Sequence, residues 1–281
     1  MMHTPDHADE TDQERWTTRA ARWRETATTR ATSWQAATDL MIAALAIMPG
    51  MTMLDVASGP GEPALSLAAA VAPDGHVTAS DLVPEMLAMA EEHARRRGIA
   101  NITFRQADVA ALPFPDGSFD AVTCRFGLMI FPDVQRGLGE MRRVLAPGGR
   151  AVCLLWGPPE QNAQMRPLAV VRHYVDLPEP APGEPHRFRF AVPGELAEQL
   201  RMAGFRHIEE AMHHLPVQWI GTPEERWEAM LRNNRRMAAK IAALAPELHA
   251  ALTREMLDAI RAEERRADGG TAAVVLATGL R

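Results

Sequence analysis

The sequence has very little lysine, few cysteines and no long apolar segment. Lys240 is the only lysine among 30 basic residues, and two cysteines and one tyrosine occur in 281 residues. Cys124 and Cys153 fall on adjacent predicted core strands, so we interpret them as buried apolar residues rather than a disulfide. The longest apolar run, residues 40–48, is too short for a membrane-spanning helix, which needs about 18 residues. No spacing typical of metal ligands occurs, and we expect no bound metal.

The charge balance is acidic. The formal net charge is −6 and the sequence pI is about 5.9. A protein that binds nucleic acid normally presents a basic surface, so we exclude nucleic acid as the substrate. The first fifteen residues are polar and acidic, unlike a signal peptide, and we expect a cytoplasmic protein that acts on a small molecule.

A glycine-rich turn follows the apolar strand predicted over residues 51–57. Gly59 and Gly61 have no Cβ, so the backbone can take positive φ and approach a ligand closely. A helix is predicted from Glu62, with Pro63 near its first position and free amides at its N-terminus that favour an anion. The pattern is typical of a loop around a nucleotide-like ligand, although G-x-G alone also fits an ordinary tight turn.

Acidic residues follow the next two predicted strands. Asp81 ends the strand at 76–81, twenty residues after Gly61, where a ribose-binding carboxylate is found in nucleotide-binding folds. Asp81 could instead be the N-cap of the helix that follows. Asp108 follows the strand at 102–106. With Asp55, these acids would line one crevice at the carboxyl ends of the strands of an open α/β sheet.

Several motifs in order resemble the class I S-adenosylmethionine-dependent methyltransferases, in particular a small-molecule branch similar to the ubiquinone and menaquinone biosynthesis C-methyltransferases. The resemblance covers residues 50–156 and is carried by the segments GMTMLDVASGPG (50–61), ADV (107–109), LPF (112–114), FD (119–120) and LAPGGR (145–150). It implies S-adenosylmethionine as cofactor and a doubly wound, seven-stranded, mostly parallel sheet, the Rossmann-like methyltransferase fold, with helical lid insertions.

The resemblance also implies a role for each cofactor-binding residue. The loop backbone at Ala57, Ser58, Gly59 and Gly61 would hold the methionine end, with Asp55 supporting the loop and the cofactor's ammonium. Asp81 would accept from both ribose hydroxyls. Leu82 and Met86 would pack near the ribose and adenine, and Ala107, Asp108 and Val109 would bind the adenine. The backbone carbonyl of Arg125 would face the ammonium, and its side chain could face the substrate. The family often has glycine in place of Ala57.

Two other functions are open. One is a nicotinamide-dependent oxidoreductase, which uses a related fold with the motif G-x-G-x-x-G. In this sequence Ala64 occupies the position of the third glycine, and Asp55 would repel the pyrophosphate of a dinucleotide. A non-catalytic cofactor-binding partner protein is the other alternative. We favour a methyltransferase that moves a methyl group to C or O of a small, largely apolar acceptor (aromatic, quinone-like or isoprenoid) by in-line displacement.

Alternating strands and helices predict the order of elements. Strands are expected at 51–57, 76–81, 102–106, 119–125, 150–156, 205–211 and 271–279, and helices at 62–71, 84–97, 133–145 and 192–203. We divide the chain into an N-terminal helical lid (1–49), the cofactor-binding core (50–156), an insertion with a helix at 163–175 (157–191), a core helix and strand (192–212), a helical cap or homodimer surface (213–270) and a final core strand (271–281), which would pair antiparallel beside the sixth.

The acceptor side of the site is predicted from aromatic residues and histidines outside the core. Trp16, Trp23 and Trp34 are spaced by seven and eleven residues, so they share one helix face and either pack on the sheet or form an aromatic wall. The expected substrate pocket consists of Trp23, Trp34, Met129, Trp156 and Tyr174. If the acceptor must lose a proton, the candidate general bases are His173, His213 and His214.

Overall fold

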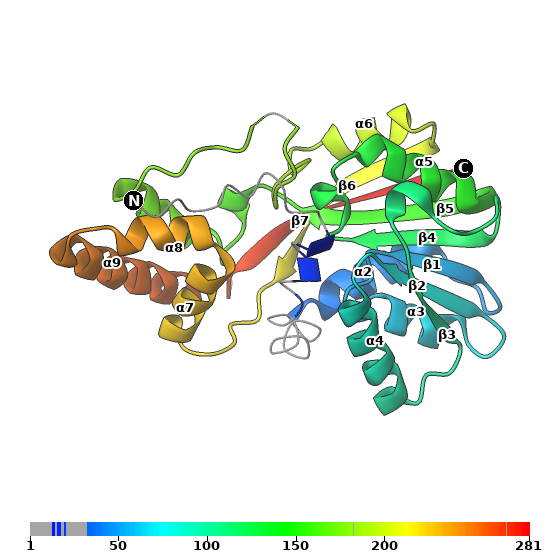
Figure 1. Cartoon of the computed structure of the whole chain (residues 1–281), viewed down its shortest axis with the longest axis horizontal. Coiled ribbons are helices and arrows are strands. Elements are labelled where there is room, and N and C mark those ends of the chain that lie inside the picture. Colours follow the sequence, from blue (N-terminus) through cyan, green and yellow to red (C-terminus); the bar gives the residue numbers. More distant parts are fainter. Residues whose placement is uncertain (1–12, 15, 18–19, 21–32, 182, 268) are drawn as a thin grey trace. The chain divides into compact units, whose positions relative to one another are not determined.

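The fold is described from a computed structural model, which describes residues 13–14, 16–17, 20, 33–181, 183–267 and 269–281. Trp23 lies outside the described residues. Seven strands form one sheet in the order β3-β2-β1-β4-β5-β7-β6 (Figure 1). The strands are β1 (Thr52–Val56), β2 (His76–Asp81), β3 (Ile102–Gln106), β4 (Phe119–Arg125), β5 (Leu145–Trp156), β6 (Arg206–Pro216) and β7 (Thr271–Leu280).

The strand order reverses at β1. β1 pairs in parallel with both β2 and β4, and the parallel pairs β2–β3 and β4–β5 extend the sheet on either side. β7 runs antiparallel to β5, because Arg281 bonds to Gly149 at one end while Gly157 bonds to Ala273 at the other. The predicted sheet is confirmed. In such a sheet the ligand crevice lies outside the carboxyl ends of the two strands at the reversal, here β1 and β4.

Helices connect the strands close to where the sequence predicts them. They are α2 (Gln35–Leu45), α3 (Ala64–Val71), α4 (Pro84–Arg97), α5 (Val134–Val144) and α6 (Glu195–Met202), with short 3-10 helices η2 (Val109–Ala111) and η3 (Leu128–Ile130). Gly98, at φ +67°, ends α4, and its amide bonds to the last carbonyls of the helix. α3 begins two residues later than predicted, because Pro63 is its N-cap. Figure 1 shows α3 and α4 beside β1–β3 and α5 beside β4 and β5.

β5 and β6 have a boundary several residues from the predicted one, whereas the boundaries of the other strands agree to within one residue. β5 begins at Leu145 rather than Arg150, because Leu145 already pairs with Phe119 before the register shifts between Phe119 and Ala121. The intervening turn is therefore a bulge within the strand. β6 continues to Pro216 instead of ending at residue 211, so His213 and His214 lie inside a strand rather than after one.

The sheet core contains both cysteines. Cys124 on β4 pairs in register with Cys153 on β5, and both thiols are free and fully buried. Burial raises the pKa of the Cys153 thiol to about 12, so this side chain is neutral and unreactive at physiological pH. The interpretation of both residues as buried apolar side chains is confirmed.

The chain forms two compact units. The first contains residues up to Leu154, Ala197–Glu209 and Ala277–Arg281, and the second contains Leu155–Leu196 and Glu210–Leu276. The second unit holds α7 (Pro223–Asn233), α8 (Arg235–Ala242), α9 (Pro246–Glu264) and the 3-10 helices η4 (Pro159–Gln161) and η5 (Arg166–His173). The helix predicted at 163–175 is thus a shorter 3-10 helix.

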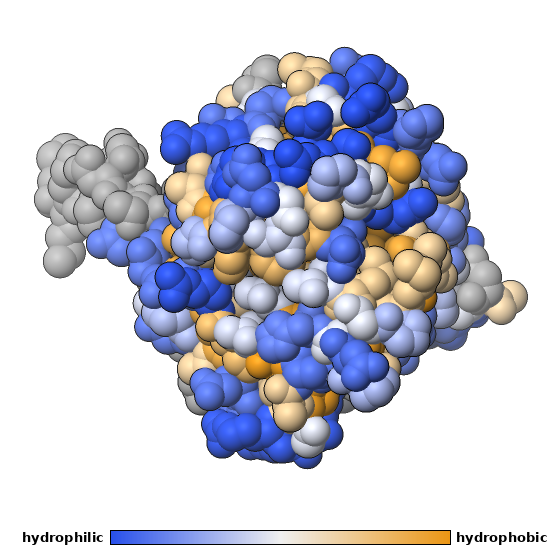
Figure 2. Space-filling model, turned by 90° about the vertical axis from the view of Figure 1, so that its right-hand side faces the viewer, coloured by the Kyte–Doolittle hydropathy of each residue, from blue (hydrophilic) through white to orange (hydrophobic). Residues whose placement is uncertain are grey.

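The second unit has an apolar core of its own. Its buried members are Val171, Val175, Trp227, Met237, Ile241, Leu252, Met256 and Ile260. Leu248 of α9 lies outside this core and is 49% exposed. On the face shown in Figure 2, apolar residues lie in small groups among hydrophilic ones. None of the helices in the described ranges is both long enough and apolar enough to cross a bilayer.

Candidate cofactor site

Asp55 is a fully buried carboxylate at the end of β1. Its Oδ1 accepts a hydrogen bond from Thr123 Oγ1 at 2.6 Å, from the neighbouring strand β4. Its Oδ2 is buried and has no hydrogen-bond partner in the described part of the chain. Burial raises the pKa of Asp55 from 3.8 to about 7, although the Thr123 hydroxyl, the Arg125 charge and the Ala64 amide each lower it. A buried acceptor without a donor indicates a place for a polar or cationic ligand group.

The loop after β1 takes three positive φ angles. They are +53° at Ala57, +52° at Gly59 and +115° at Gly61. A Cβ on Gly59 would have no atom within 4 Å, whereas one on Gly61 would lie 2.8 Å from Leu65 Cδ1. Gly59 therefore leaves open space at the loop, and Gly61 allows α3 to pack closely. Ser58 Oγ is buried without a partner among the described residues.

Asp81 joins the loop to the end of β2. Its Oδ2 accepts from the Gly59 amide at 2.8 Å and its Oδ1 from the Val83 amide at 2.9 Å. The N-cap of α4 is Val83, so the alternative interpretation of Asp81 as N-cap is wrong. Burial raises the pKa of Asp81, and the same backbone amides oppose the rise.

Backbone bonds bring the ends of three strands together. The Ser58 amide bonds to the Ser80 carbonyl at 2.9 Å, and the Ala107 amide bonds to the Asp81 carbonyl at 3.0 Å. The predicted cofactor residues of β1, β2 and β3 therefore lie along one edge of the sheet. Asp108 is exposed at this edge, and its Oδ1 accepts from the Ala110 amide as N-cap of η2.

An apolar cluster lies beside Asp81. Met86 is buried with Val83, Met89 and Ala20, and Leu82 and Trp16 pack at the margin. The resemblance implied roles for Leu82 and Met86 near the ribose and adenine. Trp16 and Ala20, from the N-terminal segment, are additional residues at this place.

Arg125 ends β4 and connects three segments. Its Nη1 donates to Thr38 Oγ1 at 2.7 Å and to the Trp34 carbonyl at 3.4 Å, both at the start of α2. Its Nη2 donates to the Glu62 carbonyl at 2.9 Å. Burial lowers the pKa of Arg125, while the charges of Glu62 and Asp55 oppose the change.

Phe126 and Gly127 follow Arg125 in strained or crowded positions. Phe126 takes φ +58°, and its ring contacts Trp34 edge-on with centroids 5.9 Å apart. A Cβ on Gly127 would lie 2.8 Å from Ala57 Cβ, so glycine lets the loops after β1 and β4 touch. Strained residues of this kind cluster at functional sites. Sequence reasoning missed Gly127, Thr123 and His93, whose Nδ1 lies 2.9 Å from the Pro60 carbonyl.

The sequence comparisons bear on this edge directly. Residues 29–175 match the ubiE/COQ5 methyltransferase family. The chain belongs to that family. It is 38% identical over 186 residues to a demethylmenaquinone methyltransferase of Deinococcus radiodurans, covering 60% of this chain and 74% of the relative. It is 50% identical over 111 residues to the demethylmenaquinone methyltransferase of Thermus thermophilus, covering 40% of this chain and only half of the relative's length.

A solved structure supports the fold assignment. The phosphoethanolamine N-methyltransferase 2 of Haemonchus contortus, solved with S-adenosyl-L-methionine, aligns with a TM-score of 0.51 at 18% identity. The alignment covers 88% of this chain and 52% of that one. The ubiE/COQ5 family member described here therefore has the Rossmann-like methyltransferase fold.

The predicted acceptor-side residues lie mainly in the second unit. His173 is exposed at the end of η5, and His214 Nε2 lies 3.1 Å from Gln161 Oε1. Tyr174 donates its hydroxyl to Glu255 Oε1 at 2.7 Å. Their roles, and those of His213 and Trp156, stay predictions. In the first unit Met129 is buried in η3, and Trp34 is the N-cap of α2.

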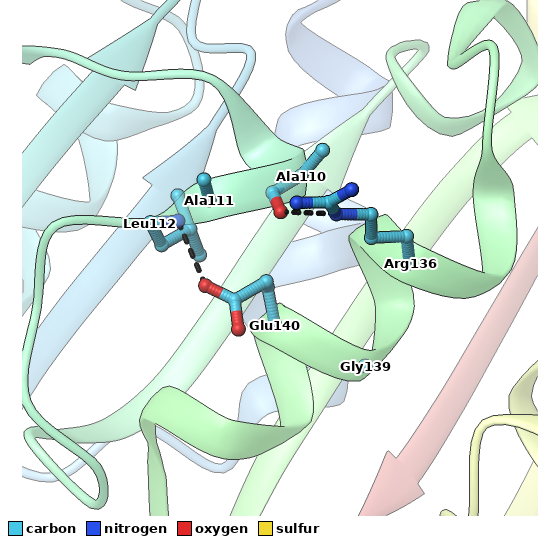
Figure 3. Close-up of a pocket in the computed structure, with 6 residues that line it drawn as sticks. All are labelled: Ala110, Ala111, Leu112, Arg136, Gly139 and Glu140. Atoms are coloured by element: carbon cyan, nitrogen blue, oxygen red, sulfur yellow. Dashed lines mark hydrogen bonds between the residues drawn. The ribbon is translucent and has the colours of Figure 1, made fainter.

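A surface recess lies next to the predicted adenine-binding residues (Figure 3). It has a volume of about 450 Å³ and is lined by Ala110, Ala111, Leu112, Arg136, Gly139 and Glu140. Glu140 accepts from the Leu112 amide, and Arg136 Nε donates to the Ala110 carbonyl, both at 2.8 Å. These bonds fasten η2 to α5. The two bonds therefore help to position η2, which contains Val109 and has Asp108 as its N-cap, in this ubiE/COQ5 family member.

Proposed function

We propose that the protein is an S-adenosylmethionine-dependent methyltransferase that methylates C or O of a small, quinone-like acceptor. The observation that carries the proposal is a pair of buried oxygens, Asp55 Oδ2 and Ser58 Oγ, which have no hydrogen-bond partner among the described residues and lie beside a glycine-rich loop at the strand reversal. These polar atoms fit the ammonium-bearing end of the cofactor, because a buried acceptor is stabilised by a donor or cation.

The other cofactor groups have matching residues along the same edge. Asp81 already orders the loop through the Gly59 amide, and the lone pairs left on its oxygens would accept from the ribose hydroxyls. Asp108 is exposed, and its Oδ2 accepts no hydrogen bond from the residues that the structure describes, so it would accept from the adenine amino group. The Val109 amide would donate to a ring nitrogen.

For methyl transfer, the main task of the protein is to position the acceptor relative to the methyl group. A bound sulfonium supplies a methyl group that is already activated for displacement. The side chains around it must align the acceptor and exclude water, and good alignment contributes on the order of 7 to 11 kcal/mol in the best cases. His173, His213 and His214 are the proposed bases where an acceptor hydroxyl must lose its proton.

The acceptor class comes from the relatives. Two similar proteins are named demethylmenaquinone methyltransferase, and the predicted apolar pocket suits a quinone-like ring. A dinucleotide is disfavoured as cofactor, because the ionised form of Asp55 beside the loop would repel a pyrophosphate at short range.

Binding and turnover measurements test the proposal. Isothermal titration with S-adenosylmethionine and with NADH should show binding of the first alone. Incubation with methyl-labelled donor and a set of demethylated quinols should give a labelled product by mass spectrometry, together with S-adenosylhomocysteine. Binding of NADH alone, or cofactor binding without any turnover across the acceptor set, would argue against this function.

A further inference from the structure

Arg125 forms no ion pair with any residue that the structure describes. Its acceptors in the described ranges are the Thr38 hydroxyl and the carbonyls of Trp34 and Glu62, all of them neutral. The Glu62 carboxylate is already bonded to Arg97 Nη1 and Ser66 Oγ. A partly buried guanidinium held only by neutral oxygens gains considerably from a nearby anion.

The Arg125 guanidinium also has N–H groups that donate no hydrogen bond within the described part of the chain. Arginine has five N–H groups, and three are used here, two on Nη1 and one on Nη2. Nε–H and one N–H of Nη2 remain without a partner among the described residues. Two donors on one planar group are suited to a carboxylate, which arginine binds with two parallel hydrogen bonds.

Asp55 is the complementary unsatisfied group on the next strand. β1 and β4 pair in parallel, and Asp55 faces Thr123 two residues before Arg125. The charges of Asp55 and Arg125 influence each other, yet no hydrogen bond joins the two side chains. One unsatisfied carboxylate oxygen and one unpaired guanidinium thus lie at neighbouring strand ends. An α-amino-acid group carries both opposite charges.

We propose that Arg125 binds the carboxylate of the cofactor's amino-acid end while Asp55 faces its ammonium, so that the site selects a zwitterion. The inference rests on the proposed function and adds a specificity-determining residue to it. Thr38 and the start of α2 hold the guanidinium in place. The start of α2 therefore contributes to cofactor selection, because it positions Arg125.

Three adenosyl ligands that differ in the charged groups of their amino-acid end test this proposal. S-adenosylmethionine has both, decarboxylated S-adenosylmethionine keeps only the amine, and methylthioadenosine has neither. Wild-type protein should bind the first at least about tenfold more tightly than the decarboxylated form, since charge-assisted hydrogen bonds are lost. In Arg125→Gln this preference should fall to within about twofold, with methylthioadenosine affinity unchanged, whereas Arg125→Lys should keep part of it.

The control is Arg96→Gln, which removes an exposed arginine of α4 paired with Glu92 and should leave all three affinities unchanged. Equal weakening of every ligand in Arg125→Gln, or a retained preference for the carboxylate, would overturn the assignment. If circular dichroism shows that Arg125→Gln does not fold, Thr38→Val decides: a severalfold smaller preference supports the proposal and an unchanged one contradicts it. Absence of adenosyl-ligand binding by the wild type would instead overturn the proposed function, and this inference with it.

Discussion

At the scale of single residues, Ala57 is the clearest departure from an ideal cofactor loop. It takes φ +53°, where a Cβ crowds the following carbonyl oxygen. Glycine adopts this conformation without that crowding. The structure thus gives a physical reason why glycine would suit this position.

Replacing Ala57 by glycine should therefore stabilise the protein. Relief of the left-handed strain outweighs the entropy cost of glycine, and we expect a gain of up to about 1 kcal/mol in the free energy of unfolding. Urea denaturation measures it. The matched control is Ala68→Gly within α3, a buried helical position, where the same change should cost at least about 1 kcal/mol. A loss of stability in Ala57→Gly would show that the strain is unimportant.

Asp55 should make cofactor binding depend on pH. Burial raises its pKa to about 7, so the carboxyl becomes increasingly neutral below pH 7. The charge of Arg125 lowers this pKa and the charge of Glu62 raises it. A cationic ammonium favours the ionised form, so affinity for S-adenosylmethionine should rise between pH 5.5 and 7.5. It should decline above about pH 8 as the α-amino group itself deprotonates.

The variant Asp55→Asn should remove the rising part of this profile, and methylthioadenosine, which has no ammonium, should show none in either protein. The stability of the ligand-free protein should change in the opposite sense. The unfolded chain releases this proton near pH 3.8 and the folded one near 7, so the folded state binds more protons between these values. Raising the pH through that window should destabilise wild type more than Asp55→Asn.

At the scale of elements, the loop between β1 and α3 uses its two glycines differently. Both have positive φ, but only the Gly61 position is crowded, by Leu65 and by Ala90 of α4. Gly61 is therefore required for packing, and Gly59 for the open backbone that faces the proposed ligand. The sequence motif alone could not separate these two roles.

The paired variants Gly59→Ala and Gly61→Ala should separate stability from binding. Gly61→Ala should destabilise the fold by about 2 kcal/mol or more, because strain and overpacking add. Gly59→Ala should cost about 1 kcal/mol of stability, from strain alone, and lower S-adenosylmethionine affinity by a larger factor. Thermal unfolding and calorimetry give the two quantities. The reverse ranking of stabilities would contradict the assigned roles.

At the scale of the whole molecule, the sequence predicted what depends on local pattern. Alternating strands and helices gave the sheet, and α4 was predicted from Pro84 to Arg97 as found. Contacts between residues far apart in the chain could not be predicted from this local pattern. Arg125 and Thr38 are 87 residues apart, and Gly127 reaches Ala57 only through the pairing of β1 with β4. The early start of β5 likewise depends on its partner strand rather than on its own residues.

The residues predicted to bind the cofactor and the candidate bases belong to different units. The predicted cofactor residues belong to the first unit, where bonds among the ends of β1, β2 and β3 bring them to one edge. The candidate bases His173, His213 and His214 belong to the second. We therefore propose that the adenosyl ligand binds in the first unit, where Asp81 orders the loop after β1.

Calorimetric titration of S-adenosylmethionine into wild type and Asp81→Ala tests that claim most directly. We predict saturable binding at one site per chain in the wild type. The variant should bind more weakly by about 1 to 3 kcal/mol, roughly 5- to 150-fold, because the Gly59 and ribose hydrogen bonds are lost together. Equal affinities in the two proteins, or wild-type binding of NADH in place of S-adenosylmethionine, would contradict the account.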